Sequence, residues 1–266
     1  MNFRIISALV MRYIYLYTRT PMRLVELVFW PMVDLLIWGY LTIYIRDNTS
    51  GAFSDKIVFL LGAMILWDVV FRAQQGVAVS FLEDVWTRNL LNIFVAPVRT
   101  SEYLAATFAV GLLRICVTVV VMCLVALFLY QFNVLVIGLP LVPFVINLLV
   151  CGWSLGMIST ALILRWGQAA ESLAWAVPFF IQPISAVFYP VGAIRPAWLQ
   201  WIAQCMPTTH VFEGMRGVMQ NGVFDWTQFV YASLLNVVFM TAAGVVFTSM
   251  LRTTKKRGLL TKFATQ

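Results

Sequence analysis

Long apolar stretches alternate with short polar segments along the whole chain. A helix needs about 20 predominantly apolar residues to cross a bilayer, and hydrocarbon offers no water to an unpaired backbone, so helices are expected in it. The pattern therefore predicts an all-α integral membrane protein, folded as one transmembrane domain over residues 1–266 with a six-helix bundle. The predicted spans are 24–45, 57–79, 103–130, 134–164, 172–189 and 229–251.

Residues 3–20, ahead of the first span, have a different periodicity. One helical face carries apolar and aromatic residues, namely Ile6, Leu9, Val10, Tyr13, Leu16 and Tyr17. The opposite face carries Arg4, Arg12 and Arg19. Basic amphipathic helices of this kind lie in the membrane interface. We therefore expect an N-terminal interfacial helix that ends at Pro21.

The composition agrees with a membrane protein, because 62% of the residues are hydrophobic and only 11% are charged, against about 25% charged in soluble domains. The net charge of +7 gathers at the two ends of the chain, which argues against a nucleic-acid-binding domain. With both termini on one side, that side holds Arg4, Arg12, Arg19, Arg23, Arg88, Arg99, Arg165, Arg252, Lys255, Lys256, Arg257 and Lys262. The other side holds Arg46, Lys56, Arg195 and Arg216. The positive-inside rule predicts cytoplasmic termini and a multi-pass protein of the plasma (inner) membrane.

Three charged residues fall near the middle of predicted spans, where charge is costly and usually faces protein or water. Asp68 and Arg72 are four residues apart with the acid first, the favourable order for a helical ion pair. They either neutralise each other alone or share a polar cluster with Asp34, which lies at a similar depth in the first span. Arg114 in the third span is a candidate to balance the second acid.

The polar segment between the second and third spans contains a short apolar run. Glu83 and Asp84 are expected at its start, where a helix dipole favours negative charge, and Pro97 ends it. The segment is either an interfacial connector or a cytoplasmic docking helix for a partner. The residues that would serve docking are Glu83, Asp84, Trp86, Arg88, Leu90, Leu91, Phe94 and Pro97.

Three short motifs follow one another along the chain. The first runs from Glu83-Asp84 through Leu90-Leu91 to Ala96-Pro97-Val98. The second is Phe188-Tyr189-Pro190 followed by Pro196-Ala197-Trp198-Leu199-Gln200, and the third is Met206-Pro207-Thr208-Thr209-His210 with Glu213 and Arg216 after it. In order and spacing they resemble segments in permeases of the type 2 ABC exporters, and the likeness covers essentially the whole chain.

This resemblance implies the membrane subunit of an ATP-driven exporter of lipids, glycolipids, polysaccharides or amphipathic drugs. Two such permeases, alike or different, pair within membrane lipid, and each docks a separate ABC ATPase through the loop after the second span. ATP and Mg²⁺ bind to that ATPase, and no cofactor is expected on this chain. The resemblance places the coupling segment at 83–97 and an extracellular re-entrant region at 191–209. The residues expected at that extracellular gate are Phe188, Tyr189, Pro190, Pro196, Trp198, Pro207, Glu213 and Arg216.

The residues themselves give little sign of catalysis. The sequence has no G-x-x-x-x-G-K-[ST] loop to hold nucleotide phosphates. His210 is the only histidine, and only Glu213 stands at ligand spacing from it, so no metal site is expected. Two other functions remain open: a gradient-driven transporter or channel that uses Asp34, Asp68 and Arg72, and a membrane enzyme acting on lipid substrates. Re-entrant residues 191–209 also have an alternative interpretation, an amphipathic loop on the lipid surface.

Overall fold

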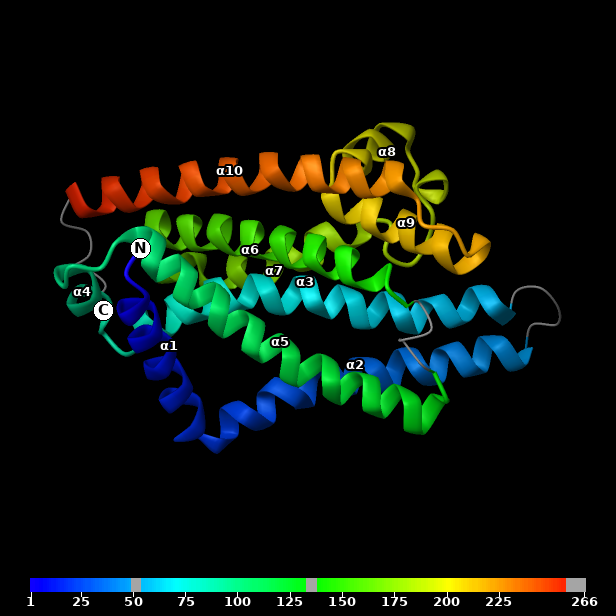
Figure 1. Ribbon diagram of the computed structural model, residues 1–266, viewed down its shortest axis with the longest axis horizontal. Coiled ribbons are helices and arrows are strands. Elements are labelled where there is room, and N and C mark those ends of the chain that lie inside the picture. The colour runs from blue at the N-terminus through cyan, green and yellow to red at the C-terminus, as the bar shows by residue number, and fades with distance from the viewer. Residues whose placement is uncertain (49–53, 133–137, 257–266) are drawn as a thin grey trace.

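The computed structural model describes residues 1–48, 54–132 and 138–256, and within these ranges every regular element is a helix (Figure 1). The longer helices are α1 (Phe3–Thr18), α2 (Pro21–Asn48), α3 (Ser54–Trp86), α5 (Thr100–Tyr130), α6 (Leu141–Trp166), α9 (Pro207–Asn221) and α10 (Trp226–Lys256). The shorter ones are α4 (Leu90–Val95), η2 (Gly167–Ala170), α7 (Glu171–Ile181), η3 (Gln182–Ile184), η4 (Val191–Ala193) and α8 (Ala197–Gln204).

Four helices in the described ranges are long and apolar enough to cross a membrane: α2 over Pro21–Ile45, α5, α6 and α10. The predicted count of six spans is therefore not confirmed. The second predicted span lies in α3, whose length of 33 residues is sufficient. However, Asp68, Arg72, Gln74 and Gln75 lower its hydropathy. These four side chains are buried inside the bundle, so their polarity is not presented to lipid.

The fifth predicted span, 172–189, which Pro178 and Pro183 interrupt in the sequence, is not one continuous membrane-crossing helix in the structure. α7 has only 11 residues, which is about 16 Å at 1.5 Å per residue. Pro183 then stands in the 3₁₀ helix η3, and the chain continues irregularly through Tyr189. Prolines remove backbone donors and break the helix before it could cross about 30 Å of hydrocarbon. Part of the fourth predicted span, 134–137, lies outside the described residues, and α6 begins at Leu141.

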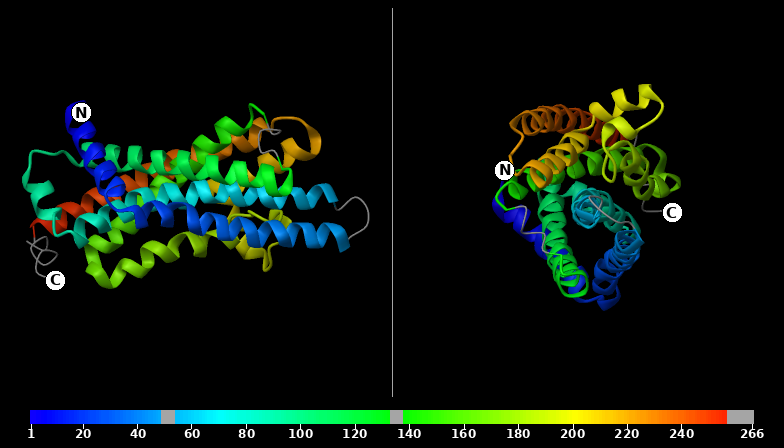
Figure 2. Two further views of the ribbon diagram at one scale, coloured as in Figure 1. Left: turned by 90° about the horizontal axis from the view of Figure 1, so that it is seen from below. Right: turned by 90° about the vertical axis from the view of Figure 1, so that its right-hand side faces the viewer.

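α3 lies in the middle of the helix bundle. In Figure 1, α10 and α2 lie at opposite edges, with α6 and α3 between them, and the end-on view in Figure 2 agrees. α3 packs against α2, α5, α6 and α7, whereas α10 packs mainly on α6 and α9. Between Phe59 and Val85 almost every α3 side chain is buried. A helix surrounded in this way can carry polar side chains that its neighbours satisfy.

Glycines allow α3 to approach α5 and α6 closely. A Cβ atom on Gly156 of α6 would lie 2.7 Å from the Gln74 carbonyl oxygen of α3, and one on Gly152 would lie 2.6 Å from the Val70 carbonyl oxygen. Gly76 of α3 similarly faces Gly111 of α5. Membrane helices associate through small residues because lipid supplies little hydrophobic driving force between them. The Gly152-x-x-x-Gly156 pattern of α6 therefore fixes the α3–α6 contact.

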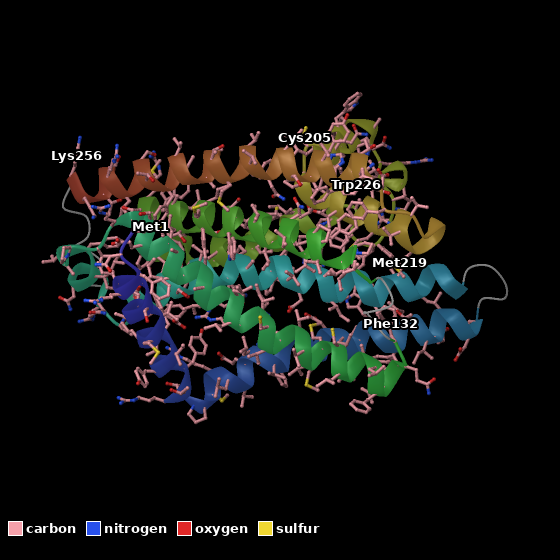
Figure 3. The ribbon with its side chains drawn as sticks, viewed as in Figure 1. Met1, Phe132, Cys205, Met219, Trp226 and Lys256 are labelled. Carbon is pink, nitrogen blue, oxygen red and sulfur yellow. The ribbon has the colours of Figure 1, made fainter. Side chains whose placement is uncertain are left out.

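The molecule has two distinct ends along its long axis. α1, α4 and the last turn of α10 lie at one end, and α8, α9 and the first turn of α10 lie at the other (Figure 1). Figure 3 accordingly shows Met1 and Lys256 at one end and Cys205, Met219 and Trp226 toward the opposite end. The segments 83–97 and 191–209 are thus separated by the length of the bundle.

Candidate functional site

The segment 83–97 joins α3 to α5, and its acids lie elsewhere than the sequence pattern predicts. Glu83 and Asp84 belong to the last turn of α3, and the short helix α4 begins only at Leu90. Arg88, with φ of 53°, turns the chain between the two helices. The expectation that the acids open the short helix is therefore wrong. At a helix C-terminus the dipole disfavours carboxylates, so other groups must compensate both charges.

Asp84 is fully buried and binds three side chains from two other helices. Its Oδ1 accepts a hydrogen bond from Arg12 Nη2 at 2.6 Å. Its Oδ2 accepts from the hydroxyls of Tyr13 at 2.6 Å and Tyr103 at 2.9 Å. Charge-assisted hydrogen bonds are roughly twice as strong as neutral ones. Asp84 consequently ties the N-terminal helix α1 and the start of α5 to the end of α3.

Glu83 ties the next turn of α1, and also α2, to the end of α3. Its Oε1 accepts from Tyr17 Oη at 2.9 Å and from Arg23 Nη1 at 3.1 Å. Its Oε2 lies 3.6 Å from Arg114 Nη2, and the Arg114 guanidinium stands 4.3 Å from the centre of the Tyr17 ring. We call Glu83, Asp84 and these six partners the carboxylate cluster. Its three arginines offset the two buried acids and the unfavourable dipole.

The tyrosines of α1 act in this cluster as hydrogen-bond donors. Burial raises the pKa of Tyr13 well above its ordinary value, and the negative charge of Asp84 raises it further. Burial likewise raises the pKa of Tyr17, which faces Glu83. Both hydroxyls therefore keep their protons at neutral pH. A phenol that stays protonated beside a carboxylate serves as a fixed structural contact.

α4 packs one face onto the bundle and leaves other residues of the segment exposed. Leu90 and Ile93 are buried against the end of α3 and Tyr103, and the Phe94 and Tyr103 rings lie 5.5 Å apart. The exposed residues of the segment include Trp86, Arg88, Val95 and Pro97, and Val95 is 77% exposed. The Leu91 side chain lies outside the described part of the chain.

Two further contacts join this segment to distant helices. The Trp86 indole N–H donates to Glu171 Oε2 at the start of α7, at 3.3 Å. Lys255, in the last turn of α10, places its ammonium 4.6 Å from the centre of the Phe94 ring. Residues 83–97 therefore contact α1, α2, α5, α7 and α10. A force applied to this segment would act on most of the bundle.

The charges that the sequence predicts to lie within the membrane form a group separate from the carboxylate cluster. Arg72 Nε lies 3.3 Å from both carboxylate oxygens of Asp68, and both side chains are buried. Asp34 is exposed on α2, and its charge interacts with those of Arg72 and Asp68. Arg114 belongs instead to the carboxylate cluster, through Glu83. It is therefore not the partner that the sequence suggested for the second acid.

At the opposite end, Arg216 of α9 holds the irregular chain that follows η3. Its Nη2 donates to the carbonyls of Val187 at 3.2 Å and Tyr189 at 2.9 Å, and it also contacts the carbonyl of Ala186. Its Nη1 pairs with Glu213 at 2.9 Å, and Glu213 Oε1 accepts from the Val191 N–H at 2.8 Å. Glu213 and Arg216 thus satisfy backbone groups that a helix would have paired internally.

The other residues predicted for this gate lie around the same chain. The Phe188 ring stacks on Trp38 of α2 with centroids 4.5 Å apart. Pro196 and Pro207 stand at the starts of α8 and α9, and Pro190 precedes η4. Trp198 is 62% exposed.

His210 forms hydrogen bonds with other residues at this end of the molecule. Its Nδ1 lies 2.7 Å from Gln228 Oε1, and its Nε2 lies 2.9 Å from the Gln204 carbonyl oxygen. Among the described residues, no group of three or more His, Cys, Asp or Glu side chains is placed to hold a metal ion.

Sequence reasoning missed the partners of the two acids. It assigned Tyr13 and Tyr17 to the apolar face of α1 and Arg12 to the opposite face, yet all three reach the carboxylates. A signal was present, because two tyrosines one helical turn apart place two hydroxyls on an otherwise apolar face. Two adjacent acids elsewhere in the chain are natural acceptors for them. Arg114 was recognisable as a charge within a predicted span, but nothing in the sequence identified Glu83 as its partner. Arg23 gave no comparable signal.

Comparison with known proteins agrees with this architecture. The family model described as ABC-2 type transporter matches residues 4–220, so the chain belongs to the ABC-2 type transporter family. It is a membrane component of an ABC transporter. It is also similar to "ABC transporter G family member 20" of Dictyostelium discoideum, with 28% identity over 217 residues. That match covers 81% of this chain but only 28% of the relative's length.

Proposed function

We propose that this chain is the membrane subunit of an ATP-driven exporter. In this proposal a separate ABC ATPase, which carries ATP and Mg²⁺, docks on residues 83–97 at the end of the molecule that holds both termini. That end faces the cytoplasm, as the positive-inside rule favours. The cargo is an amphipathic molecule moved outward, a lipid, a glycolipid or polysaccharide, or a drug.

One observation carries the coupling role: the contacts of residues 83–97 with α1, α2, α5, α7 and α10 within a chain of the ABC-2 family. The exposed side chains of Trp86, Arg88 and Val95 offer the contact surface. The buried Glu83 and Asp84 then have a role other than docking. They join the docking surface rigidly to the helices that must move, because breaking a buried charge pair is costly.

Pairing of two permeases is supported by Asp34. It is exposed on α2 although it lies ten residues into a predicted membrane span, and exposed charge at that depth requires protein or water next to it. Exposed aromatic residues also lie on α7, which packs on α3 as α2 does, and one of them, Phe179, contacts Phe71 of α3. A second copy against α2 and α7 would place protein instead of lipid next to Asp34.

Purification from native membranes tests the docking proposal. An ABC ATPase is expected to co-purify in stoichiometric amount with the wild-type chain. The double variant Trp86→Ala, Val95→Asp should lower its recovery by at least tenfold, since truncating a hot-spot residue in an interface costs about 1 kcal/mol or more. Trp166→Ala is the matched control, because Trp166 is 56% exposed on α6 outside the segment.

Two results would contradict the proposal. The first is equal ATPase recovery with the double variant and with wild type. The second is cargo transport by the purified chain in vesicles without an ATPase. That result would favour the gradient-driven transporter, with Asp34, Asp68 and Arg72 as its charged relay.

A further inference from the structure

A cavity of about 380 Å³ lies between the first turn of α5 and the last turns of α10, at the end of the molecule that holds both termini. Its polar lining consists of Thr100, Ser101, Thr248, Arg252 and Lys255. Two cations and three hydroxyls are all hydrogen-bond donors. Such a set suits a ligand rich in oxygen acceptors and negative charge.

The two cations have no acid beside them among the described residues. None of the ion pairs found in the described ranges involves Arg252 or Lys255. The acid next to the cavity in sequence is Glu102, whose oxygens accept the backbone N–H groups of Asn2 and Arg99. Arg252 and Lys255 are both exposed. The positive charge of the cavity is therefore available to an external anion.

The position of the cavity selects the kind of anion. α5 and α10 are among the four helices apolar and long enough to span a membrane, and the cavity lies where both reach the same end. Basic pockets between membrane helices at a membrane surface bind the head groups of anionic lipids. Leu104 and Leu251 complete the lining and offer apolar contact to the first methylenes of an acyl chain.

We propose that this cavity binds the phosphate of an anionic membrane phospholipid. Arg252 and Lys255 supply the countercharge, and the hydroxyls of Thr100, Ser101 and Thr248 donate to the phosphate oxygens. Lys255 also lies over the Phe94 ring of α4. A bound lipid would therefore hold α10 and the segment 83–97 together at the membrane surface. This site goes beyond the proposed export function and needs only that α5 and α10 cross the bilayer.

Native mass spectrometry of the full chain in mild detergent tests the proposal. The probes are phosphatidylglycerol, phosphatidylcholine with the same acyl chains, and soluble glycerol phosphate. Phosphatidylglycerol should bind about tenfold more tightly than phosphatidylcholine. The variant Arg252→Gln, Lys255→Gln should weaken phosphatidylglycerol binding by about thirtyfold, because two cations are removed and each contributes on the order of 1 kcal/mol near a membrane surface.

The matched control is Arg165→Gln, Lys256→Gln, which removes the same charge from the same end of the molecule. Lys256 adjoins Lys255 in the sequence but is not among the residues that line the cavity, so this control should bind phosphatidylglycerol as wild type does. A second variant, Thr248→Phe, fills the cavity without changing charge and should also weaken binding.

Three outcomes would overturn the assignment. In the first, both double variants lose phosphatidylglycerol equally, which means that general surface charge attracts the lipid. In the second, phosphatidylglycerol and phosphatidylcholine bind alike. In the third, glycerol phosphate displaces phosphatidylglycerol at equal concentration, which means that the site recognises a free phosphate anion. None of these results depends on an ATPase, so the site can fail while the proposed export function stands.

Discussion

Asp84 illustrates how a single side chain acquires a role from its neighbours. It lies with Glu83 at the end of a helix, where the dipole disfavours negative charge, and both acids are buried. They persist because arginines and tyrosine hydroxyls from α1, α2 and α5 surround them. A carboxylate satisfied so completely fixes the position of everything that contacts it.

The Tyr13–Asp84 contact can be tested by a double-mutant cycle. Tyr13→Phe should lower the free energy of unfolding by roughly 1.5–3 kcal/mol, because it removes a hydrogen bond to a charged group. Asp84→Asn should cost a similar amount, reduced because Arg12 is 30% exposed and can regain water. The two losses should be strongly non-additive, since both variants break one network. Thermal unfolding in detergent measures them, and simple additivity would show that the contact is not coupled.

At the scale of the elements, α3 decides the arrangement of the others. Its carbonyls at Val70 and Gln74 approach Gly152 and Gly156 of α6, and Gln74 Nε2 donates to Ser159 Oγ and the Ala174 carbonyl. α3 thereby fixes the positions of both α6 and α7. Close backbone approach and interhelical hydrogen bonds replace the hydrophobic driving force that a soluble core would have.

Alanine at either glycine of α6 should damage this packing. The new Cβ of Gly152→Ala or Gly156→Ala would meet α3 backbone at 2.6–2.7 Å, and overpacking of this kind costs about 1–3 kcal/mol. Gly244→Ala on α10 is the control, because nothing lies within 4 Å of a Cβ there. It should be neutral or slightly stabilising, since alanine favours helix. Size-exclusion chromatography and melting in detergent report the difference, and equal behaviour of the three variants would disprove the close-contact explanation.

At the scale of the whole molecule, the two ends differ in chemistry. One end carries α1, α4, the carboxylate cluster and the basic last turn of α10 (Figure 1). The other carries α8, α9 and the contacts of Arg216 and Glu213 that support chain 186–191. This division agrees with the exporter proposed above, in which an ATPase docks at the end that carries residues 83–97.

Accessibility of cysteine tests the orientation of these ends. Cys205 is exposed at the α8–α9 end, whereas Lys256 ends α10 at the other (Figure 3). With the other native cysteines replaced by alanine, a membrane-impermeant maleimide added to intact cells should label Cys205. In a chain that also carries Cys205→Ala and Lys256→Cys, labelling should require permeabilised cells. The reverse pattern would invert the topology and remove the cytoplasmic position proposed for residues 83–97.

The sequence by itself determined the membrane class and the helical fold, because lipid imposes helices however they pack. The positions of the Lys and Arg residues gave the two basic ends of the chain. The sequence also pointed to residues 83–97 as a distinct segment. Hydropathy alone failed for residues 172–189. Pro178 and Pro183 lie in this apolar run, and the structure divides it into α7, which contains Pro178, and η3, which contains Pro183.

Only the tertiary structure decided which residues meet. Glu83 and Asp84 read as exposed docking acids, yet Arg12, Tyr13, Arg23, Tyr103 and Arg114 enclose them from three other helices. It likewise brought Thr100 and Ser101 beside Arg252 and Lys255, about 150 residues along the chain. Hydropathy gives only the preference of each single residue for lipid or water. The cost of a buried charge depends on its partners, and the sequence does not state which residues those are until the helices have packed.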